Sequence, residues 1–297
     1  MKSRTRRKRA FERRKNSFLN LFLLFLLFFF LILAFIKEDF QKRPEKVEES
    51  LDLDPRDMPV VLSVSPTPYS KLRLPILMYH YVEHVTDKRD TIRQKMAVNP
   101  EEFEFQIKSL KDAGYTFHFL SEIPNIISGK ARYHPKMIFL TFDDGYEDFY
   151  MVAYPILKKH LIKSTEFIVY DFIGRYNYMK EDQIKSIVSD GLVEIASHTL
   201  DHTDLKGAST ESATLQITGS RKKLSEKFNV PVTSFAYPFG AFSTYTVDLA
   251  KQAGYTLAVS VIPGTQQGQE NLFYLTRIRP GVLGIENVVK NLESYRK

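Results

Sequence analysis

Short apolar runs alternate with amphipathic segments from Leu72 to the C-terminus. The clearest amphipathic segment spans residues 99–114, where Asn99 is a favourable N-cap, Pro100 suits the first helical position and Gly114 suits the end. The apolar runs have the length and composition of buried strands, and they read LPILMYH, MIFLTF, STEFIVY, LVEIAS, TSFAY, TLAVS and YLTRI. A strand followed by a helix, repeated six or seven times, predicts an α/β fold with a parallel sheet.

The number of strand–helix units decides between two parallel architectures. Six or seven units within one domain favour a (β/α) barrel, distorted or incomplete and with seven or eight strands, over an open doubly wound sheet. The pattern stays even to the C-terminus and shows no repeat of fixed period, so residues 71–297 are expected to form one domain.

The N-terminal residues follow a different pattern. Residues 1–16 contain nine Lys or Arg and one acid, and the nineteen residues from Phe18 to Ile36 are apolar apart from Asn20. At about 1.5 Å per residue this run would be roughly 28 Å long as a helix, which matches the hydrocarbon core of a bilayer. A basic flank before the span predicts a cytoplasmic N-terminus and an exported C-terminal body.

These features divide the chain into a basic cytoplasmic tail at 1–16, a transmembrane signal anchor at 17–36, a disordered linker at 37–70 and a folded domain at 71–297. The predicted location is the cell membrane, crossed once, with the folded domain outside the cell. A cleaved signal peptide is the alternative, but the apolar run is long for one and LAFIKED lacks a small-x-small cleavage site.

The net charge of +7 does not indicate nucleic acid as a partner. Of 42 Lys and Arg and 35 Asp and Glu, nine bases and one acid lie in residues 1–16, so that 33 and 34 remain in the rest of the chain. The basic charge therefore belongs to the tail, where it suits anionic lipid. The chain contains no cysteine, which excludes disulfides and thiolate metal sites and leaves His, Asp and Glu as metal ligands.

Polar residues gather where the predicted strands end. Asp143 and Asp144 follow MIFLTF, His198 follows LVEIAS, His80 ends LPILMYH, and YPFG follows TSFA. In a parallel barrel the carboxyl ends of all strands form one rim, and active sites lie there. The sequence therefore predicts one site that contains these residues.

The segment SHTLDHTDL carries a pattern that suits a metal. His198 and His202 are four residues apart, a spacing that would place both imidazoles on one face of a helical turn, where they can chelate a divalent cation. One of Asp143 and Asp144 would complete a facial triad, and the other would be free to act as a base. Gly145 directly afterwards would let the chain turn, so that both carboxylates face the same pocket.

The motifs TFDDG, SHTLDH and YPFG, in this order and at these separations, resemble those of the polysaccharide deacetylases, carbohydrate esterase family four, with the NodB homology domain. The resemblance covers roughly residues 72–290, and the opening PILMYHYV is similar to the branch that includes poly-N-acetylglucosamine deacetylases. It implies that the metal ligands are Asp144, His198 and His202. It also implies that Asp143 is the catalytic base and His80 the general acid, and that the backbone N–H of Phe239 donates to the oxyanion.

The sequence departs from the family pattern in three places. The arginine that steadies the catalytic base in the wider family is replaced by Ala236, and Arg277 or Arg279 in LTRIRPG is a candidate substitute from a neighbouring strand. Tryptophan is absent, so the late aspartate–tryptophan motif has no match, and no histidine follows His202 to serve as the acid. Tyr237 and Arg277 are further candidates for binding the substrate or the oxyanion.

The sequence thus predicts a metal-dependent hydrolase of carbon–nitrogen bonds that removes N-acetyl groups from an extracellular or cell-wall glycan resembling poly-N-acetylglucosamine. Zinc suits the ligands best, and cobalt, nickel or iron would fit the same residues. Alternatives are a peptidoglycan N-acetylglucosamine deacetylase, an O-acetyl esterase, a non-haem Fe(II) oxygenase and an inactive glycan-binding surface protein. The sequence indicates no particular protein partner.

Overall fold

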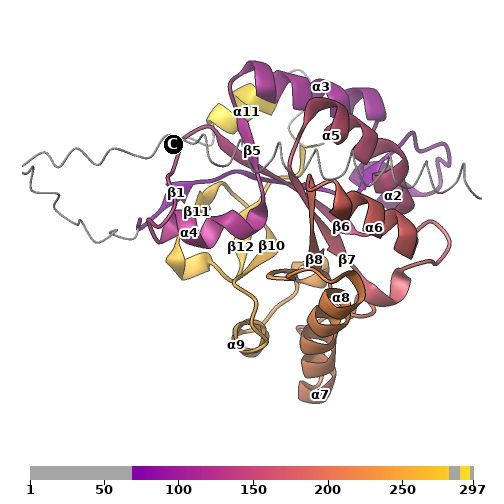
Figure 1. The fold of residues 1–297 in the computed structure, drawn as a ribbon, viewed down its shortest axis with the longest axis vertical. Helices are drawn as coiled ribbons and strands as arrows, with labels where there is room; N and C mark the ends of the chain where they lie inside the picture. The colour runs from indigo at the N-terminus through magenta and orange to yellow at the C-terminus, as the bar shows by residue number, and fades with distance from the viewer. Residues whose placement is uncertain (1–68, 281–287, 295–297) are drawn as a thin grey trace, which may run out of the picture. The chain divides into compact units, whose positions relative to one another are not determined.

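The computed structural model of the protein describes residues 69–280 and 288–294 (Figure 1). The predicted tail at 1–16, the predicted anchor at 17–36 and all but the last two residues of the predicted linker at 37–70 lie outside the described residues. Within the described part, no helix has both the length and the apolar character needed to cross a bilayer.

Eight parallel strands form the central sheet. Their bounds are β2 Ile76–Tyr79, β5 Thr116–His118, β6 Met137–Asp144, β7 Ser164–Ile168, β8 Val193–Ser197, β9 Ser234–Ala236, β10 Leu257–Pro263 and β12 Leu275–Arg277. The order around the sheet is β12-β10-β9-β8-β7-β6-β2, and β5 pairs with the beginning of β6. Each of the apolar runs predicted to be a strand coincides with one of these strands, and β6 and β10 extend beyond their runs.

The sheet closes on itself between its first and last strands. Just after β12, Ile278 donates its N–H to the carbonyl oxygen of Ile76 at 2.8 Å and accepts a hydrogen bond from the N–H of Met78 at 2.9 Å. These two bonds join the ends of the sheet into a nearly closed parallel barrel. The prediction of an α/β barrel is confirmed at this level, and an open doubly wound sheet is not formed.

Two short pairs of strands flank the barrel. Strand β1 (Leu72–Arg73) pairs antiparallel with β11 (Gln266–Gln267), and β3 (Tyr81–Val82) pairs in parallel with β4 (Ala97–Val98). The second pair lies directly after β2, at the carboxyl end of the barrel strands, where the sequence places the candidate chemistry.

Helices follow the strands as the alternation predicted. The α-helices are α2 Thr91–Met96, α3 Pro100–Asp112, α4 Ile123–Ile127, α5 Tyr154–His160, α6 Glu181–Ser189, α7 Thr210–Thr214, α8 Ser220–Phe228, α9 Thr244–Gln252 and α11 Val288–Ser294. Short 3₁₀ turns are η1 Leu120–Glu122, η3 Tyr170–Phe172, η5 Pro238–Gly240 and η6 Gln269–Asn271, and π-helical turns are η2 Phe149–Ala153 and η4 Leu215–Gly219.

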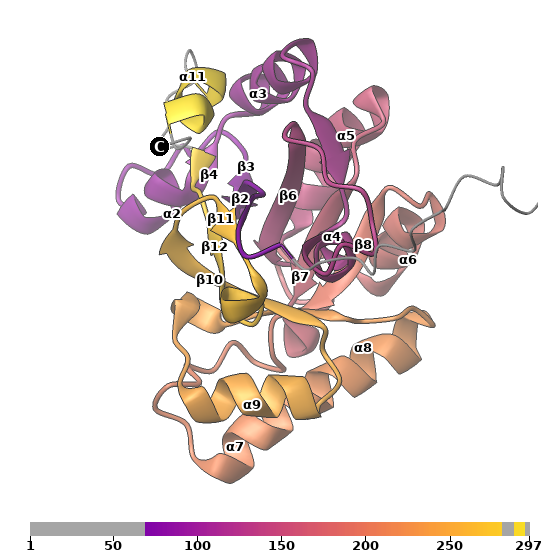
Figure 2. The same ribbon diagram turned by 90° about the vertical axis from the view of Figure 1, so that its left-hand side faces the viewer.

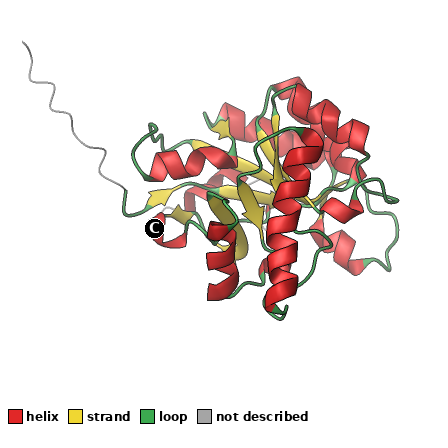
Figure 3. Ribbon diagram, turned by 60° about the horizontal axis from the view of Figure 1, so that its bottom comes forward, coloured by secondary structure: helices red, strands yellow, loops and turns green. Residues whose placement is uncertain are grey.

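Alternate residues of each strand face two different hydrophobic layers, because side chains alternate along a strand. On β6, Ile138, Leu140 and Phe142 pack with the helices outside the barrel, whereas Phe139 packs inside it. Helix α4 contributes to the inner layer, and α3, α5, α6 and α8 cover the outside of the strands (Figure 2). Figure 3 shows the helices arranged around the strands. This alternation points Thr141 and Asp143 toward the interior at the rim.

Candidate active site

The carboxylate of Asp143 is bound through both of its oxygens by the guanidinium group of Arg277. The guanidinium Nη1 and Nη2 of Arg277 donate to the two carboxylate oxygens of Asp143 at 2.7 Å each. Nη1 also donates to Thr141 Oγ1 at 3.1 Å, and Nε donates to the carbonyl oxygen of Ser260 at 2.8 Å. Both partners of this ion pair are buried. The pair is therefore a rigid bidentate contact in a site that excludes most water.

The charge on Asp143 follows from this contact. Burial alone would raise the pKa of Asp143, but the Arg277 guanidinium more than offsets it and holds the pKa below the usual range. Asp143 is thus an ionised carboxylate with a fixed orientation. Both terminal nitrogens of Arg277 are bonded to Asp143, so Arg277 fits the role of the missing arginine better than the predicted role in substrate binding. Arg279, the other candidate, forms no hydrogen bond or ion pair with Asp143.

Asp144 reaches the same rim through an unusual backbone conformation. It is the last residue of β6, and by strict alternation its side chain would point to the outside of the barrel. Its φ of 83° lies in the left-handed region, which non-glycine residues seldom adopt, and Gly145 follows with a φ of 82°. The turn expected at Gly145 therefore begins one residue earlier, at Asp144 itself, and carries its carboxylate toward the two histidines.

The segment from His198 to His202 is a loop, so the expected helical turn is wrong. Thr199 and His202 both have positive φ values, of 70° and 68°. Thr199 Oγ1 accepts a hydrogen bond from the N–H of His202 at 3.0 Å. The buried Gln216 Oε1 accepts from the N–H groups of Leu200 and Asp201 at 2.8 and 3.2 Å. These bonds fold the loop so that the two imidazoles still meet.

Gln216 is a structural support of the site that sequence reasoning missed. It lies in η4, within the stretch predicted to be one amphipathic helix, and its side chain is buried. A buried amide oxygen needs hydrogen-bond donors, and Gln216 Oε1 finds two of them on the loop from His198 to His202. The only sequence signal was a polar residue next to apolar Leu215 and Ile217 on a helix.

The three predicted ligands converge on one point. Nε2 of His198 and Nε2 of His202 each lie 3.3 Å from Asp144 Oδ1, and the three candidate ligand atoms lie within 4.8 Å of one another. His198 Nδ1 donates to the carbonyl oxygen of Ala236 at 2.8 Å, which leaves a lone pair on Nε2 that faces the carboxylate. Asp144 Oδ1 is buried and makes no hydrogen bond.

Lone pairs that face one another in a buried site repel unless a cation lies between them, so this donor set fits a divalent metal ion. Two imidazoles and one carboxylate suit zinc, and they also accept cobalt, nickel or iron. Burial would raise the pKa of Asp144, but the two imidazoles hold it well below its usual range, as a metal ligand requires.

His80 lies on the other side of Asp143. It follows β2 directly, and its Nε2 is 4.0 Å from Asp143 Oδ2, with 12% of its side chain exposed. Burial lowers the pKa of His80, and the carboxylates of Asp143 and Asp144 oppose this effect. An imidazole at the edge of the site can hold a proton that a leaving group needs.

The YPFG segment offers the site the backbone N–H of Phe239, but not the side chain of Tyr237. Phe239 has a φ of 60° in η5, its ring lies 4.5 Å from that of His202, and 66% of the residue is exposed. N–H groups in the first turn of a helix have no partner within it, so the N–H of Phe239 is suited to an oxyanion. Tyr237 is buried and donates its hydroxyl to the carbonyl oxygen of Phe273 at 3.0 Å, so the predicted contact with substrate does not fit its position.

A parallel barrel that brings an ionised carboxylate, three converging donor atoms and an imidazole to one rim has the groups that a metal-dependent hydrolase would need. Residues 130–258 match the sequence profile of the family described as Polysaccharide deacetylase. A relative from Bacillus subtilis (strain 168), YxkH, which is named as a polysaccharide deacetylase, is 31% identical over 246 residues, or 82% of this chain and 84% of the relative. The chain belongs to the polysaccharide deacetylase family, whose members are hydrolases of carbon–nitrogen bonds other than peptide bonds.

Other relatives carry more specific names. The poly-beta-1,6-N-acetyl-D-glucosamine N-deacetylase of Staphylococcus aureus is 26% identical over 242 residues, which covers 77% of this chain and 82% of the relative. Among solved structures, the Streptococcus pyogenes deacetylase PplD in complex with acetate is 32% identical with a TM-score of 0.69, and the match covers 76% of this chain and 99% of that chain.

Proposed function

We propose that the protein is a metal-dependent N-deacetylase of an extracellular or cell-wall glycan of the poly-N-acetylglucosamine type, held at the cell membrane by its N-terminal anchor. The observation that carries this proposal is the buried Asp143 carboxylate, fixed by Arg277 between the three-donor site and His80. The name of the Staphylococcus aureus relatives supports the glycan, and the basic and apolar N-terminal segments support the location.

The three converging residues would hold the metal ion that the reaction needs. When bound by Asp144, His198 and His202, a divalent cation supplies Lewis acidity to the amide carbonyl and to water. The tasks that remain, which are orientation, proton transfer and stabilisation of charge, belong to side chains and backbone groups of the chain itself.

Asp143 is the base in this mechanism. It takes a proton from the attacking water as the water oxygen bonds to the acetyl carbon. Arg277 keeps the carboxylate ionised and oriented, so no rearrangement is needed at that moment. The N–H of Phe239 donates to the carbonyl oxygen as its negative charge develops.

His80 is the acid. When the carbon–nitrogen bond breaks, the electron pair goes to nitrogen and His80 supplies the proton, so that a sugar amine and acetate are released. An amine needs this protonation to leave, whereas an ester releases an alcohol more readily. The placement of His80 beside Asp143 therefore favours amide over O-acetyl substrates.

The test uses the full-length, zinc-loaded chain in detergent micelles, with acetate and free amine recorded from two neutral substrates. β-1,6-linked N-acetylglucosamine oligomers and chitin oligomers are compared, with Asp143→Asn alongside as the inactive control. Equal amounts of acetate and amine that disappear in the variant are expected. Zinc bound at one per chain without acetate from either neutral glycan would contradict a poly-N-acetylglucosamine substrate and favour peptidoglycan or O-acetyl substrates, or a glycan-binding protein.

A further inference from the structure

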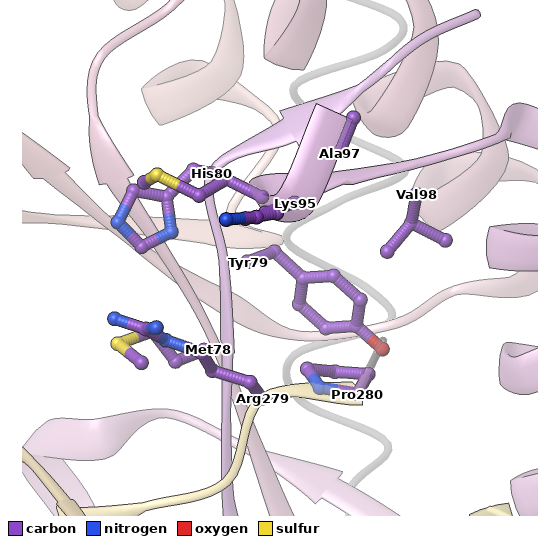
Figure 4. A pocket seen from close by; sticks show the side chains of 9 residues that line it. Met78, Tyr79, His80, Lys95, Ala97, Val98, Arg279 and Pro280 are labelled. Carbon is purple, nitrogen blue, oxygen red and sulfur yellow. The ribbon is translucent and has the colours of Figure 1, made fainter. Parts of the chain in front are cut away.

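A pocket with two cationic side chains lies beside the proposed acid (Figure 4). Its cavity volume is about 20 Å³, and the residues that line it include Met78, Tyr79, His80, Lys95, Arg279 and Pro280. Figure 4 shows the side chains of Lys95 and Arg279 extending toward the side of the pocket where the imidazole of His80 lies. Neither cation belongs to the catalytic machinery described above.

The position of Lys95 is set by the short strand pair after β2. Tyr81 and Val82 of β3 pair with Ala97 and Val98 of β4. Lys95 lies two residues before this pair, in the last turn of α2, and His80 lies one residue before it on the other strand. The pairing of β3 with β4 therefore holds the end of α2 next to His80.

Arg279 comes from the seam where the barrel closes. It follows Ile278, whose N–H and C=O are both bonded to β2. His80 follows β2 by one residue, so the same two hydrogen bonds fix Arg279 near the imidazole. Two segments far apart in sequence thus place one cation each around the pocket.

The acids that precede Lys95 in this part of the sequence have other partners. Glu83 pairs with Arg93, and Asp87 pairs with Arg89 at 2.9 Å. Asp90 accepts the N–H of Arg93 as the N-cap of α2. Within residues 69–280 and 288–294, neither Lys95 nor Arg279 forms an ion pair, and both are exposed. Two exposed cations at one pocket without acids to neutralise them attract an anion.

We propose that Lys95 and Arg279 bind an anionic substituent, a carboxylate or a phosphate, carried by the glycan within about one sugar of the acetamido group that reacts. This inference rests on the proposed function, because it takes His80 as the group that faces the leaving amine. The sugar carbon that bears the amine must then lie next to the pocket. Substituents on the oxygens of the neighbouring ring carbons, or on the adjoining sugar, are the groups that reach it.

The chemistry favours an anion over a neutral hydroxyl. Arg and Lys donate charge-assisted hydrogen bonds to carboxylate and phosphate oxygens, and these bonds are stronger than those to neutral acceptors. Among glycans that contain N-acetylglucosamine, those with a carboxylate or a phosphate near the reacting acetamido group would then be preferred over unsubstituted ones.

The first experiment compares three substrates with the full-length, zinc-loaded chain. They are a neutral chitin oligomer, a peptide-free glycan of alternating N-acetylglucosamine and N-acetylmuramic acid, and an N-acetylglucosamine oligomer that carries a phosphate. The variant is Lys95→Gln with Arg279→Gln. Each charged hydrogen bond lost is expected to lower the ratio of kcat/KM for the anionic glycan to that for the neutral one by about tenfold.

The matched control is Lys130→Gln with Arg132→Gln, which removes the same two charges from exposed positions between α4 and β6. This control should keep the wild-type ratio. The two anionic substrates tell carboxylate from phosphate. A wild-type protein that prefers the neutral oligomer, or a pocket variant whose ratio equals that of the control, would overturn the inference and leave the deacetylase function intact.

A binding measurement keeps the inference testable if no glycan is turned over. Calorimetry with Asp143→Asn, with and without the two pocket substitutions, gives the affinity for the same three glycans. We expect tighter binding of an anionic glycan that weakens with added salt and is lost in the pocket variant. Equal affinities for neutral and anionic glycans would reject the anion pocket, whatever the outcome for acetate release.

Discussion

Arg277 and Asp143 meet through two parallel hydrogen bonds of 2.7 Å, although they come from β12 and β6 and lie 134 residues apart in the sequence. Both side chains are buried, so neither can exchange this partner for water. A base whose charge and orientation are fixed in this way is prepared to take a proton without rearrangement. The structure thus supplies, from another strand, the arginine that the motif at Ala236 lacks.

Replacement of Arg277 by Met should lower kcat by about 10²-fold or more, because the carboxylate loses its fixed direction. KM and zinc content should change little, since Arg277 touches neither the metal ligands nor the pocket around His80. Loss of the partner also leaves a buried charge unpaired, which costs about 3–5 kcal/mol of stability. Steady-state kinetics, metal analysis and urea unfolding would measure the three effects.

Arg277→Lys is the informative control for this prediction. It keeps the positive charge but cannot form the bidentate contact, so part of the stability and a smaller part of kcat should return. A kcat for Arg277→Met close to that of the wild type would show that Asp143 does not depend on this arginine.

His80→Ala should reduce kcat by about 10²- to 10⁴-fold, because the leaving amine loses its proton donor. Zinc content should stay at the wild-type value, since His80 is not among the three converging ligands. His84→Ala is the matched control: this histidine is exposed and pairs with Glu101 at 3.0 Å. Full activity in both variants would remove His80 from the mechanism.

Asp144→Asn and His202→Ala should each lower zinc affinity and abolish turnover, because each removes one of three donors. Zinc at 100 times its Kd would stabilise the wild-type chain by about 2.7 kcal/mol and so raise its melting temperature. This rise in melting temperature should be smaller in both variants. His134→Ala, at an exposed position outside the site, should retain the full shift. Differential scanning calorimetry with and without a chelator would compare them.

Much of the fold could be predicted because burial leaves a clear mark on sequence. Runs such as MIFLTF and LVEIAS are mostly apolar, as expected for strands of a parallel sheet that are covered on both faces. The same pattern predicted that Asp143, Asp144 and His198 lie at one rim, because parallel strands end at one edge of the sheet. Local patterns of this kind need no knowledge of distant partners.

The remaining details depend on contacts that no local pattern encodes. The loop at His202 is shaped by Thr199 and by Gln216 from a later helix, so a four-residue spacing suggested a helical turn that does not form. The turn begins at Asp144 with a positive φ, whereas the sequence predicts a positive φ only at Gly145, because glycine adopts it readily. Tyr237 was a candidate for substrate binding, but its side chain is buried in the core.

Asp148 allows a prediction on pH and stability away from the metal ligands. Burial raises the pKa of Asp148 to about 6, although its Oδ2 accepts a hydrogen bond from the N–H of Val82 at 2.6 Å. In the unfolded chain the pKa of an aspartate is about 3.9, so the folded state binds the proton more tightly. Stability due to this group therefore falls as pH rises from about 4 to about 6, and stays low above that.

Asp148→Asn keeps an acceptor for Val82 and has no charge to bury. At about pH 8 the variant should be more stable than the wild type by about 1–3 kcal/mol, and the difference should vanish near pH 4. Urea unfolding of both chains in chelator removes the contribution of the metal. For Asp112→Asn, at an exposed position on α3, the difference should change little with pH. A difference for Asp148→Asn that is constant across the range, or an unstable variant at high pH, would contradict the raised pKa.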